Sequence, residues 1–385
     1  MSMKSVEHSA LWTICEKDKG DKYVELQNSV GQRWYIPLRN SSVHLSLFQP
    51  SSIQGKIVVY LFEIIKHFPI ILHIIHAKIV RLQFTKDFQD IIENIFKTNH
   101  CTFGVFCGSP GYHQKPTLLI SKGKYILGYC KLTDNEYVKK LFQDENENLT
   151  YLHSKGIINV PTPLFCDHLP FRQSILAFIQ STNRNREKKV KIATYTNQKL
   201  IDFVKQTNTK TKVAIPFNDS DFSKSINNLE QHIHLLKDMD MKDTLKSGIS
   251  MINENRDSFK YFCASHGDLT PWNSFIVQNG FFAFDLEYFK KSYTPWYDYF
   301  HFFTQEMLYN NHANAEQIYL KYKDLRSHFF LNQNNVDLFY LSYLLIIFEF
   351  YLNRDNGILN DRINECMEIW ASLIKHILEN VSKNN

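Results

Sequence analysis

The segment 274–287, SFIVQNGFFAFDLE, constrains the fold more than any other part of the sequence. Two apolar runs flank the dipeptide Asn279-Gly280, which is a strong short-range signal for a β-hairpin. The preceding segment 265–273, SHGDLTPWN, carries histidine, aspartate and asparagine side chains, and Pro271 prevents a regular helix through it. The sequence therefore predicts a polar loop that leads directly into a hairpin.

The hairpin is expected to bring the two ends of this segment together. Asn273 precedes its first strand and Asp285 follows its second, so the strand pairing places them close to each other. A carboxylate such as that of Asp268 can accept the proton of a substrate hydroxyl, and the oxygens of Asn273 and Asp285 suit a hard cation such as Mg²⁺. Together these groups form a sensible set for phosphoryl transfer.

The composition indicates a folded protein, and its 16 His and dispersed Lys suit anionic ligands. Among 385 residues, 44% are hydrophobic and 14% aromatic, which is enough for a large core and excludes disorder for most of the chain. The net charge of +5 is mild, and a nucleic-acid-binding protein usually concentrates its charge more strongly. The seven cysteines are scattered without a CxxC pair, which excludes a disulfide framework or a zinc site and favours reduced thiols in a cytoplasmic protein.

Two apolar stretches raise the question of a membrane. Residues 57–80 contain several charged and histidine side chains, and residues 338–352 are shorter than the roughly 20 residues that a bilayer requires. We therefore expect buried helices and no integral span, although contact of 57–80 with a membrane surface or a partner stays open. The N-terminus lacks the apolar core of a secretory signal.

The periodicity of the chain divides it into three parts. Residues 1–97 are interpreted as an accessory module, 98–181 as a small antiparallel β lobe with one helix, and 182–385 as a mainly helical lobe. The segments expected to be strands are 22–27, 33–38, 101–108, 116–121, 124–132, 159–165 and 173–180, and the helices among them are 85–97 and 135–154. This order predicts an α+β fold with two lobes after an N-terminal module.

With these elements in place, the loop resembles a known family. HGDLTPWN resembles the catalytic loop of protein kinases, H-R-D-x-x-x-x-N, and still more the H-G-D form of the aminoglycoside phosphotransferase and choline kinase-like families. FAFDLE resembles the metal-binding segment of those families, and TPWYDYFHF resembles the segment beyond it. The resemblance implies a bilobal protein kinase-like fold, ATP and Mg²⁺ as cofactors, and a small-molecule hydroxyl acceptor.

The resemblance also implies a role for each matching residue. Asp268 would be the catalytic base and Asn273 and Asp285 the metal ligands, while His266 and Asp298 would support the loop. Lys131, fixed by Glu145, would contact the nucleotide phosphates; Lys124 and Glu147 fit this pair less well. Ser109 and Gly111, in the turn GSPG, lie where backbone N–H groups could face phosphate, although Ser109 could equally cap a turn.

The sequence determines the acceptor poorly. Position 270 is Thr where protein kinases often carry Lys, and no A-P-E segment follows Asp285, which argues against a protein substrate. The candidates for a substrate wall, meaning side chains that line the acceptor site, are Thr270, Trp272, Glu287 and Trp296. We expect a sugar, a polyol or a glycan-linked group, with choline, ethanolamine or an aminoglycoside as alternatives. A nucleotide-binding pseudokinase scaffold is the non-enzymatic alternative.

Overall fold

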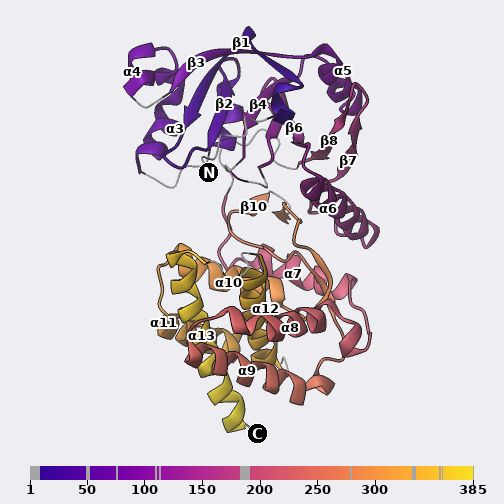
Figure 1. The fold of residues 1–385 in the computed structure, drawn as a ribbon, viewed down its shortest axis with the longest axis vertical. Coiled ribbons are helices and arrows are strands. Elements are labelled where there is room, and N and C mark those ends of the chain that lie inside the picture. The colour runs from indigo at the N-terminus through magenta and orange to yellow at the C-terminus, as the bar shows by residue number, and fades with distance from the viewer. Residues whose placement is uncertain are drawn as a thin grey trace. The chain divides into compact units, whose positions relative to one another are not determined.

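The computed structural model describes residues 9–48, 53–74, 77–108, 111, 114–182, 191–277, 280–331, 335–354, 357 and 359–384. The chain divides into two compact units (Figure 1). The first comprises Met1–Ser154 and Ile158–Lys191, and the second comprises Lys155–Ile157 and Ile192–Asn385. The predicted α+β class is confirmed, because the first unit is built on an antiparallel sheet and the second is mainly helical.

The first unit contains one sheet of eight strands in the order β3-β1-β2-β4-β5-β6-β8-β7, in which neighbouring strands are antiparallel. The strands are β1 (Cys15–Gln27), β2 (Arg33–Pro37), β3 (Lys78–Phe84), β4 (Thr102–Phe106), β5 (Thr117–Lys122), β6 (Tyr125–Thr133), β7 (Pro163–Leu169) and β8 (Arg172–Ser181). The predicted bounds lie within two residues of β2, β4, β5, β6 and β8, whereas β1 begins seven residues earlier, β7 is shifted by four residues and β3 was not expected.

The N-terminal residues continue this sheet. Strand β2 pairs with β4, with Trp34 opposite Phe106 and Tyr35 opposite Val105. The expectation of a separate module over 1–97 is therefore corrected, since its three strands share a sheet and a core with the strands of 98–181. Local periodicity identifies strands but not their partners, so the sequence did not reveal this pairing.

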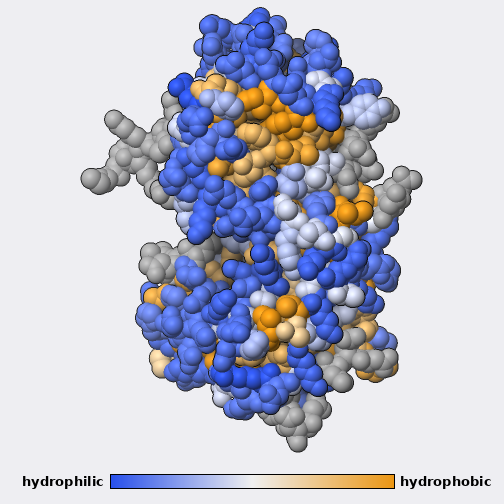
Figure 2. All heavy atoms as spheres, turned by 90° about the vertical axis from the view of Figure 1, so that its right-hand side faces the viewer, coloured by the Kyte–Doolittle hydropathy of each residue, from blue (hydrophilic) through white to orange (hydrophobic). Residues whose placement is uncertain are grey.

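The helices of the first unit pack on its sheet at several places, with α4 beside β3 at one edge and α6 beside β7 at the other (Figure 1). They are α1 (Ser9–Trp12), α2 (Ser41–His44) with the 3₁₀ turn η1 (Leu45–Leu47), α3 (Ile53–Ile65), α4 (Pro69–Ile74), α5 (Lys86–Ile95) and α6 (Glu136–Ser154). Helix α5 places Phe88 and Ile92 in the main core cluster, and α6 packs on β7 and β8. Figure 2 turns the side of α5 and α6 to the viewer and shows apolar side chains gathered on part of this unit.

The apolar segment 57–80 differs from expectation. It forms two helices and the start of β3 instead of one buried helix, and only part of it is buried. Phe62, Ile65 and Leu72 pack into a second core cluster with Val24 and Ile36 of the sheet, while most other apolar side chains of α3 and α4 are exposed.

The second unit packs its helices around α12. The helices and 3₁₀ turns are α7 (Gln198–Lys210), η2 (Phe217–Asp219), α8 (Asp221–His232), η3 (Ile233–Leu235), α9 (Met239–Glu254), η4 (Arg256–Ser258), α10 (Tyr297–Tyr309), α11 (Ala315–His328), α12 (Val336–Arg354) and α13 (Asp361–Asn384). Helix α12 contacts α8, α9, α10 and α13, which explains why it is apolar on every side. Among the described residues, Val336–Asn353 is long and apolar enough to cross a membrane, but 83% of it is buried inside the protein.

Two short antiparallel pairs hold the polar loop in the second unit. Strand β9 (Cys263–Ser265) enters the loop and pairs with β12 (Lys290–Tyr293). The predicted hairpin forms from β10 (Ser274–Val277) and β11 (Gly280–Ala283), with Val277 opposite Gly280. Residues 278 and 279 lie outside the described range.

Candidate active site

The polar loop between β9 and β10 is held by a buried carboxylate from helix α10. Asp298 accepts hydrogen bonds from the Ser265 hydroxyl at 2.7 Å and from the backbone N–H groups of His266 at 2.9 Å and Gly267 at 3.3 Å. Its side chain is buried, so these donors replace the water that the charge would otherwise bind. Asp298 thus fixes the backbone immediately before Asp268.

His266 connects the loop to the end of the hairpin. Its Nε2 donates to the carbonyl oxygen of Phe284 at 2.9 Å, and its Nδ1 accepts the backbone N–H of Asp268 at 3.3 Å. Because the two ring nitrogens bond in opposite senses, the imidazole is neutral with its hydrogen on Nε2. The side chain is buried and holds the loop backbone at Asp268 next to the end of the hairpin at Phe284.

Gly267 permits the sharp turn of the loop. Its φ of +84° lies in the left-handed region, and a Cβ at this position would lie 2.2 Å from the carbonyl oxygen of Tyr288. Both the dihedral angle and the close approach of another backbone exclude a side chain here. The loop can therefore place Asp268 where it does only with glycine at 267.

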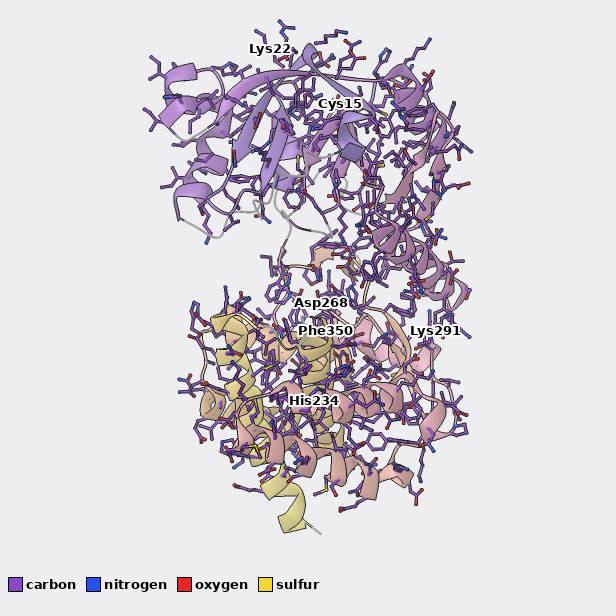
Figure 3. The ribbon with its side chains drawn as sticks, viewed as in Figure 1. Cys15, Lys22, His234, Asp268, Lys291 and Phe350 are labelled. Carbon is purple, nitrogen blue, oxygen red and sulfur yellow. The ribbon has the colours of Figure 1, made fainter. Side chains whose placement is uncertain are left out.

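Asp268, labelled in Figure 3, has a hydrogen-bonded carboxylate that solvent can still reach. Its Oδ2 accepts a hydrogen bond from the Asn273 amide at 2.7 Å, and its Oδ1 lies 3.0 Å from Nε2 of His301. The Asp268 side chain is 34% exposed, whereas that of His301 is 3% exposed. A carboxylate held on both oxygens yet open on one side can orient an incoming hydroxyl and take its proton.

His301, on helix α10, is a site residue that sequence reasoning missed. Its ring stacks parallel to that of Tyr297 at 6.2 Å and meets the Tyr343 ring edge-on at 5.6 Å. Its Nδ1 is buried and has no hydrogen-bond partner in the described part of the chain, so the hydrogen resides on Nε2 and points to Asp268. Burial raises the pKa of Tyr297 far above its usual value, so the wall behind His301 carries no charge.

Asn273 and Asp285 are brought together by the hairpin, as the sequence predicts. The register that pairs Ser274 with Ala283 continues through a hydrogen bond of 3.0 Å from the Phe284 N–H to the Asn273 carbonyl. Asp285 follows with a φ of +69°, a conformation that is uncommon for residues other than glycine. Strained residues of this kind persist where the surrounding structure holds them, and they cluster at functional sites.

The oxygen donors of this pair suit a magnesium ion. The Asn273 amide turns its NH₂ group toward Asp268, so its Oδ1 points away from that carboxylate. No cluster of three or more His, Cys, Asp or Glu side chains that could hold a metal occurs among the described residues. One amide and one carboxylate fit Mg²⁺, which keeps several waters and binds substrate phosphates alongside few protein ligands.

In the first unit, Lys131 and Glu145 form a buried ion pair. Lys131 lies on β6 and Glu145 on α6, and the Lys131 Nζ lies 2.7 and 3.0 Å from the two carboxylate oxygens. Both side chains are buried, while the alternatives Lys124 and Glu147 are exposed. The pair leaves the ammonium with one fixed orientation.

The remaining candidates have mixed outcomes. Ser109 lies outside the described residues, and a side chain at Gly111, whose φ is +153°, would meet open space. Trp272 is 43% exposed, which keeps it as a candidate for contact with a substrate, and Glu287 is partly buried. Trp296 is not a wall residue, because it is buried against Phe329, Phe330 and Tyr299.

Thr270 is also corrected as a wall residue. It is fully buried, and its hydroxyl accepts the backbone N–H of Asn273 at 3.2 Å. Its carbonyl oxygen accepts the hydroxyl of Ser274 at 2.7 Å. Thr270 therefore closes the turn that positions Asn273 and has no surface to offer a substrate.

Comparison with known proteins gives distant structural matches only. No family model matches the chain, and no curated protein matches it in sequence. Aminoglycoside phosphotransferase APH(4)-Ia with ADP and hygromycin B is similar at a TM-score of 0.48 and 8% identity, over 76% of this chain and 97% of that one. Aminoglycoside phosphotransferase APH(2'')-Ib with ADP matches at 0.44 and 14%, over 76% and 99%. A protein of Haemophilus somnus assigned as a fructosamine-3-kinase matches at 0.45 and 12%, over 76% and 96%.

Proposed function

We propose that this protein is an ATP- and Mg²⁺-dependent phosphotransferase that phosphorylates a hydroxyl group of a small molecule. The observation that carries the proposal is the Asp268 carboxylate, which is held by Asn273 and His301 and yet is one-third exposed. An aspartate that only held the loop together would have no need of access to solvent. An accessible, oriented carboxylate instead suits a general base.

In the proposed reaction, the substrate hydroxyl approaches the open side of Asp268. The hydroxyl oxygen forms a bond to the γ-phosphorus as the bond between that phosphorus and the β–γ bridging oxygen breaks, and ADP leaves with the electron pair. The hydroxyl proton passes to Asp268. The main task of the protein is to orient the reactants, since phosphoryl transfer needs positioning and charge stabilisation more than covalent catalysis.

Four further residues have proposed roles. Asn273 and Asp285 would hold Mg²⁺ through oxygen ligands, and the bound ion would neutralise charge on the phosphate groups. Lys131 would donate to nucleotide phosphate oxygens, with Glu145 holding its ammonium in place. The oxygen atoms of Asn273 and Asp285 suit a hard cation, and the ammonium of Lys131 suits phosphate oxygens.

The surroundings of Trp272 favour a sugar or polyol as the acceptor. Trp272 meets Tyr309 edge-on at 5.6 Å, and the Arg362 guanidinium lies 4.5 Å from the Tyr309 ring centroid. A quaternary amine such as choline needs free aromatic faces, but this tyrosine already binds a cation. A neutral sugar can instead stack on the exposed tryptophan and hydrogen-bond to the guanidinium. This argument ranks choline, ethanolamine and aminoglycosides below sugars and polyols.

The test is Mg²⁺-dependent release of ADP with a panel of sugars, polyols, amino alcohols and aminoglycosides, followed by identification of the phosphorylated product. We expect Asp268→Ala to abolish turnover while nucleotide binding, measured by thermal shift, is retained. Near-normal turnover by Asp268→Ala would refute the assignment of the base. Nucleotide binding without turnover by the native protein, over the whole panel, would favour a pseudokinase scaffold.

A further inference from the structure

Helices α3 and α4 expose an unusual number of large apolar side chains. The apolar residues that are more than one-third exposed here are Ile57, Tyr60, Leu61, Ile64, Phe68, Ile70, Ile71 and Ile74. We call this set the α3–α4 face. Single exposed apolar residues are ordinary on protein surfaces, but a contiguous group of this kind marks a surface that contacts something else.

The spacing of these residues shows that they form one stripe. Positions 57, 60, 61 and 64 recur with the period of a helix, so they share a face of α3, and Phe68 follows in the turn before α4. A different face of the same helix carries Phe62 and Ile65 into the core cluster that Leu72 of α4 also joins. Packing within the unit therefore explains the buried stripe and leaves the exposed one without an explanation.

The charge of the surrounding segment selects the type of partner. Residues 39–84 contain five Lys and Arg side chains and a single acid, Glu63. One of the five, Lys78, is paired with Glu25 of β1 at 3.4 Å. Glu63 is paired as well, because its carboxylate lies 2.7 Å from Lys66 Nζ and accepts the Ser41 hydroxyl at 2.8 Å. Arg39 and Lys56 are exposed. The surface thus presents apolar side chains with a surplus of positive charge.

From these observations, we infer that the α3–α4 face binds the surface of a bilayer that contains anionic phospholipids. Apolar side chains of an amphipathic helix enter the boundary between headgroups and acyl chains, while basic side chains contact anionic headgroups. The face carries isoleucine, phenylalanine and tyrosine, which suit that boundary. The binding does not depend on the proposed reaction, and it requires no membrane span.

A second copy of the chain fits this face less well. A two-fold dimer through it would bring the same patch of each copy together, so the positive surplus of one copy would face that of the other. Like charges at a contact are unfavourable, whereas an anionic bilayer neutralises them. The charge therefore favours lipid over self-association.

The test is co-sedimentation of the full chain with phosphatidylcholine vesicles that contain or lack phosphatidylglycerol, at low and high salt. We expect the chain to sediment with the anionic vesicles, and binding to weaken as salt is raised. The double variant Ile64→Gln/Ile70→Gln should lose ten-fold or more in affinity. The matched control is Leu320→Gln/Leu331→Gln, which changes two equally exposed side chains of the second unit and should bind like the native chain.

A charge variant tests the electrostatic part separately. Lys56→Glu should weaken binding to anionic vesicles by about five-fold or more, since each basic charge near such a surface contributes about that factor. The control is Lys140→Glu, at an exposed lysine of α6. An unaltered melting temperature for each variant separates loss of binding from loss of fold.

Three results would overturn the inference. The first is a native chain that stays in solution with anionic vesicles at low salt, and the second is an isoleucine variant that sediments as well as the native chain. Light scattering could also reveal a dimer that Ile64→Gln/Ile70→Gln dissociates, which would identify a second copy as the occupant. Loss of vesicle binding leaves ADP release in solution unchanged, so failure here is distinguishable from failure of the proposed reaction.

Discussion

Replacing His301 tests whether the buried imidazole positions the catalytic carboxylate. In the native protein its Nε2 donates to Asp268 Oδ1 at 3.0 Å, and the amide of Asn273 holds the other oxygen at 2.7 Å. His301→Ala removes one of these two restraints and leaves the Asp268 carboxylate free to rotate about the other. The carboxylate itself, which is the group proposed to take the proton, remains.

The structure sets the size of the effect. A hydrogen bond to a charged group contributes about 1.5–3 kcal/mol, and each 1.4 kcal/mol of transition-state stabilisation changes a rate about ten-fold. His301→Ala should therefore lower kcat by roughly 10- to 100-fold. The loss is smaller than for Asp268→Ala, because the base is misoriented but present. Nucleotide affinity should not change, since His301 contacts no residue proposed to bind phosphate.

The assay is Mg²⁺-dependent phosphate release from ATP with water as the acceptor, which requires no knowledge of the natural substrate. His301→Gln is the matched variant, because its amide offers an N–H donor at a similar reach. We expect His301→Gln to recover most of the turnover rate that His301→Ala loses. If the imidazole served only for packing, both variants would turn over equally slowly. Stability is followed in parallel, because loss of the ring also leaves a cavity between Tyr297 and Tyr343.

One result would refute the reasoning directly. If His301→Ala folds, binds nucleotide and hydrolyses ATP at the native rate, the 3.0 Å contact does not position the base. If His301→Gln is as slow as His301→Ala while both melt at the same temperature, the donated hydrogen bond is not what matters.

Three further predictions concern the supports of the site and the fold. Glu145→Ala should lower the free energy of unfolding, measured in urea, by about 3–5 kcal/mol because it leaves the buried Lys131 uncompensated, and adding Lys131→Met should restore part of the loss. Gly267→Ala should be strongly destabilising by thermal melting and should abolish turnover, whereas Gly123→Ala, at a φ of +59° in open space, should cost only about 1 kcal/mol. Burial lowers the pKa of His44 to about 3 from 6.5, so the stability it contributes is complete above pH 6.5 and declines as the pH falls toward 3. Urea unfolding at pH 6.5 and pH 5 should show a loss of about 2 kcal/mol from this group, and the loss should be absent in a folded His44→Gln variant.

The parts of the site that lie close together in sequence could be predicted from it. Asp268, Asn273 and Asp285 sit on one loop and one hairpin, where the turn signal fixes the register. The choice of Lys131 and Glu145 followed from the resemblance to the kinase families, which implies a strand lysine held by a helix glutamate, and the structure pairs them. The local pattern determined the geometry only for the loop and the hairpin.

The contact of His301 could not be predicted in that way. It lies 33 residues from Asp268, within an aromatic run on α10 where a histidine resembles an ordinary core residue. Its role depends on which face of α10 meets the loop, and that is set by packing of the whole unit. Thr270 and Trp296 show the converse, since the first lies within the loop and the second close after the hairpin, and both are nevertheless buried. Proximity in sequence places a residue near a site but does not determine where its side chain points.

The two apolar stretches illustrate why composition alone cannot separate a core helix from a surface one. Residues 338–352 and 57–74 have similar apolar character, yet α12 is enclosed by four other helices, whereas α3 and α4 pack one stripe each against the second core cluster of the first unit. Enclosure removes apolar surface from water in the first case, and in the second the exposed stripe remains in water at a cost of roughly 25 cal/mol per Å². A chain that keeps such a stripe beside a surplus of basic residues gains free energy when an anionic bilayer covers it. The vesicle experiment therefore tests whether this unburied surface has a partner, independently of whether Asp268 transfers a phosphoryl group.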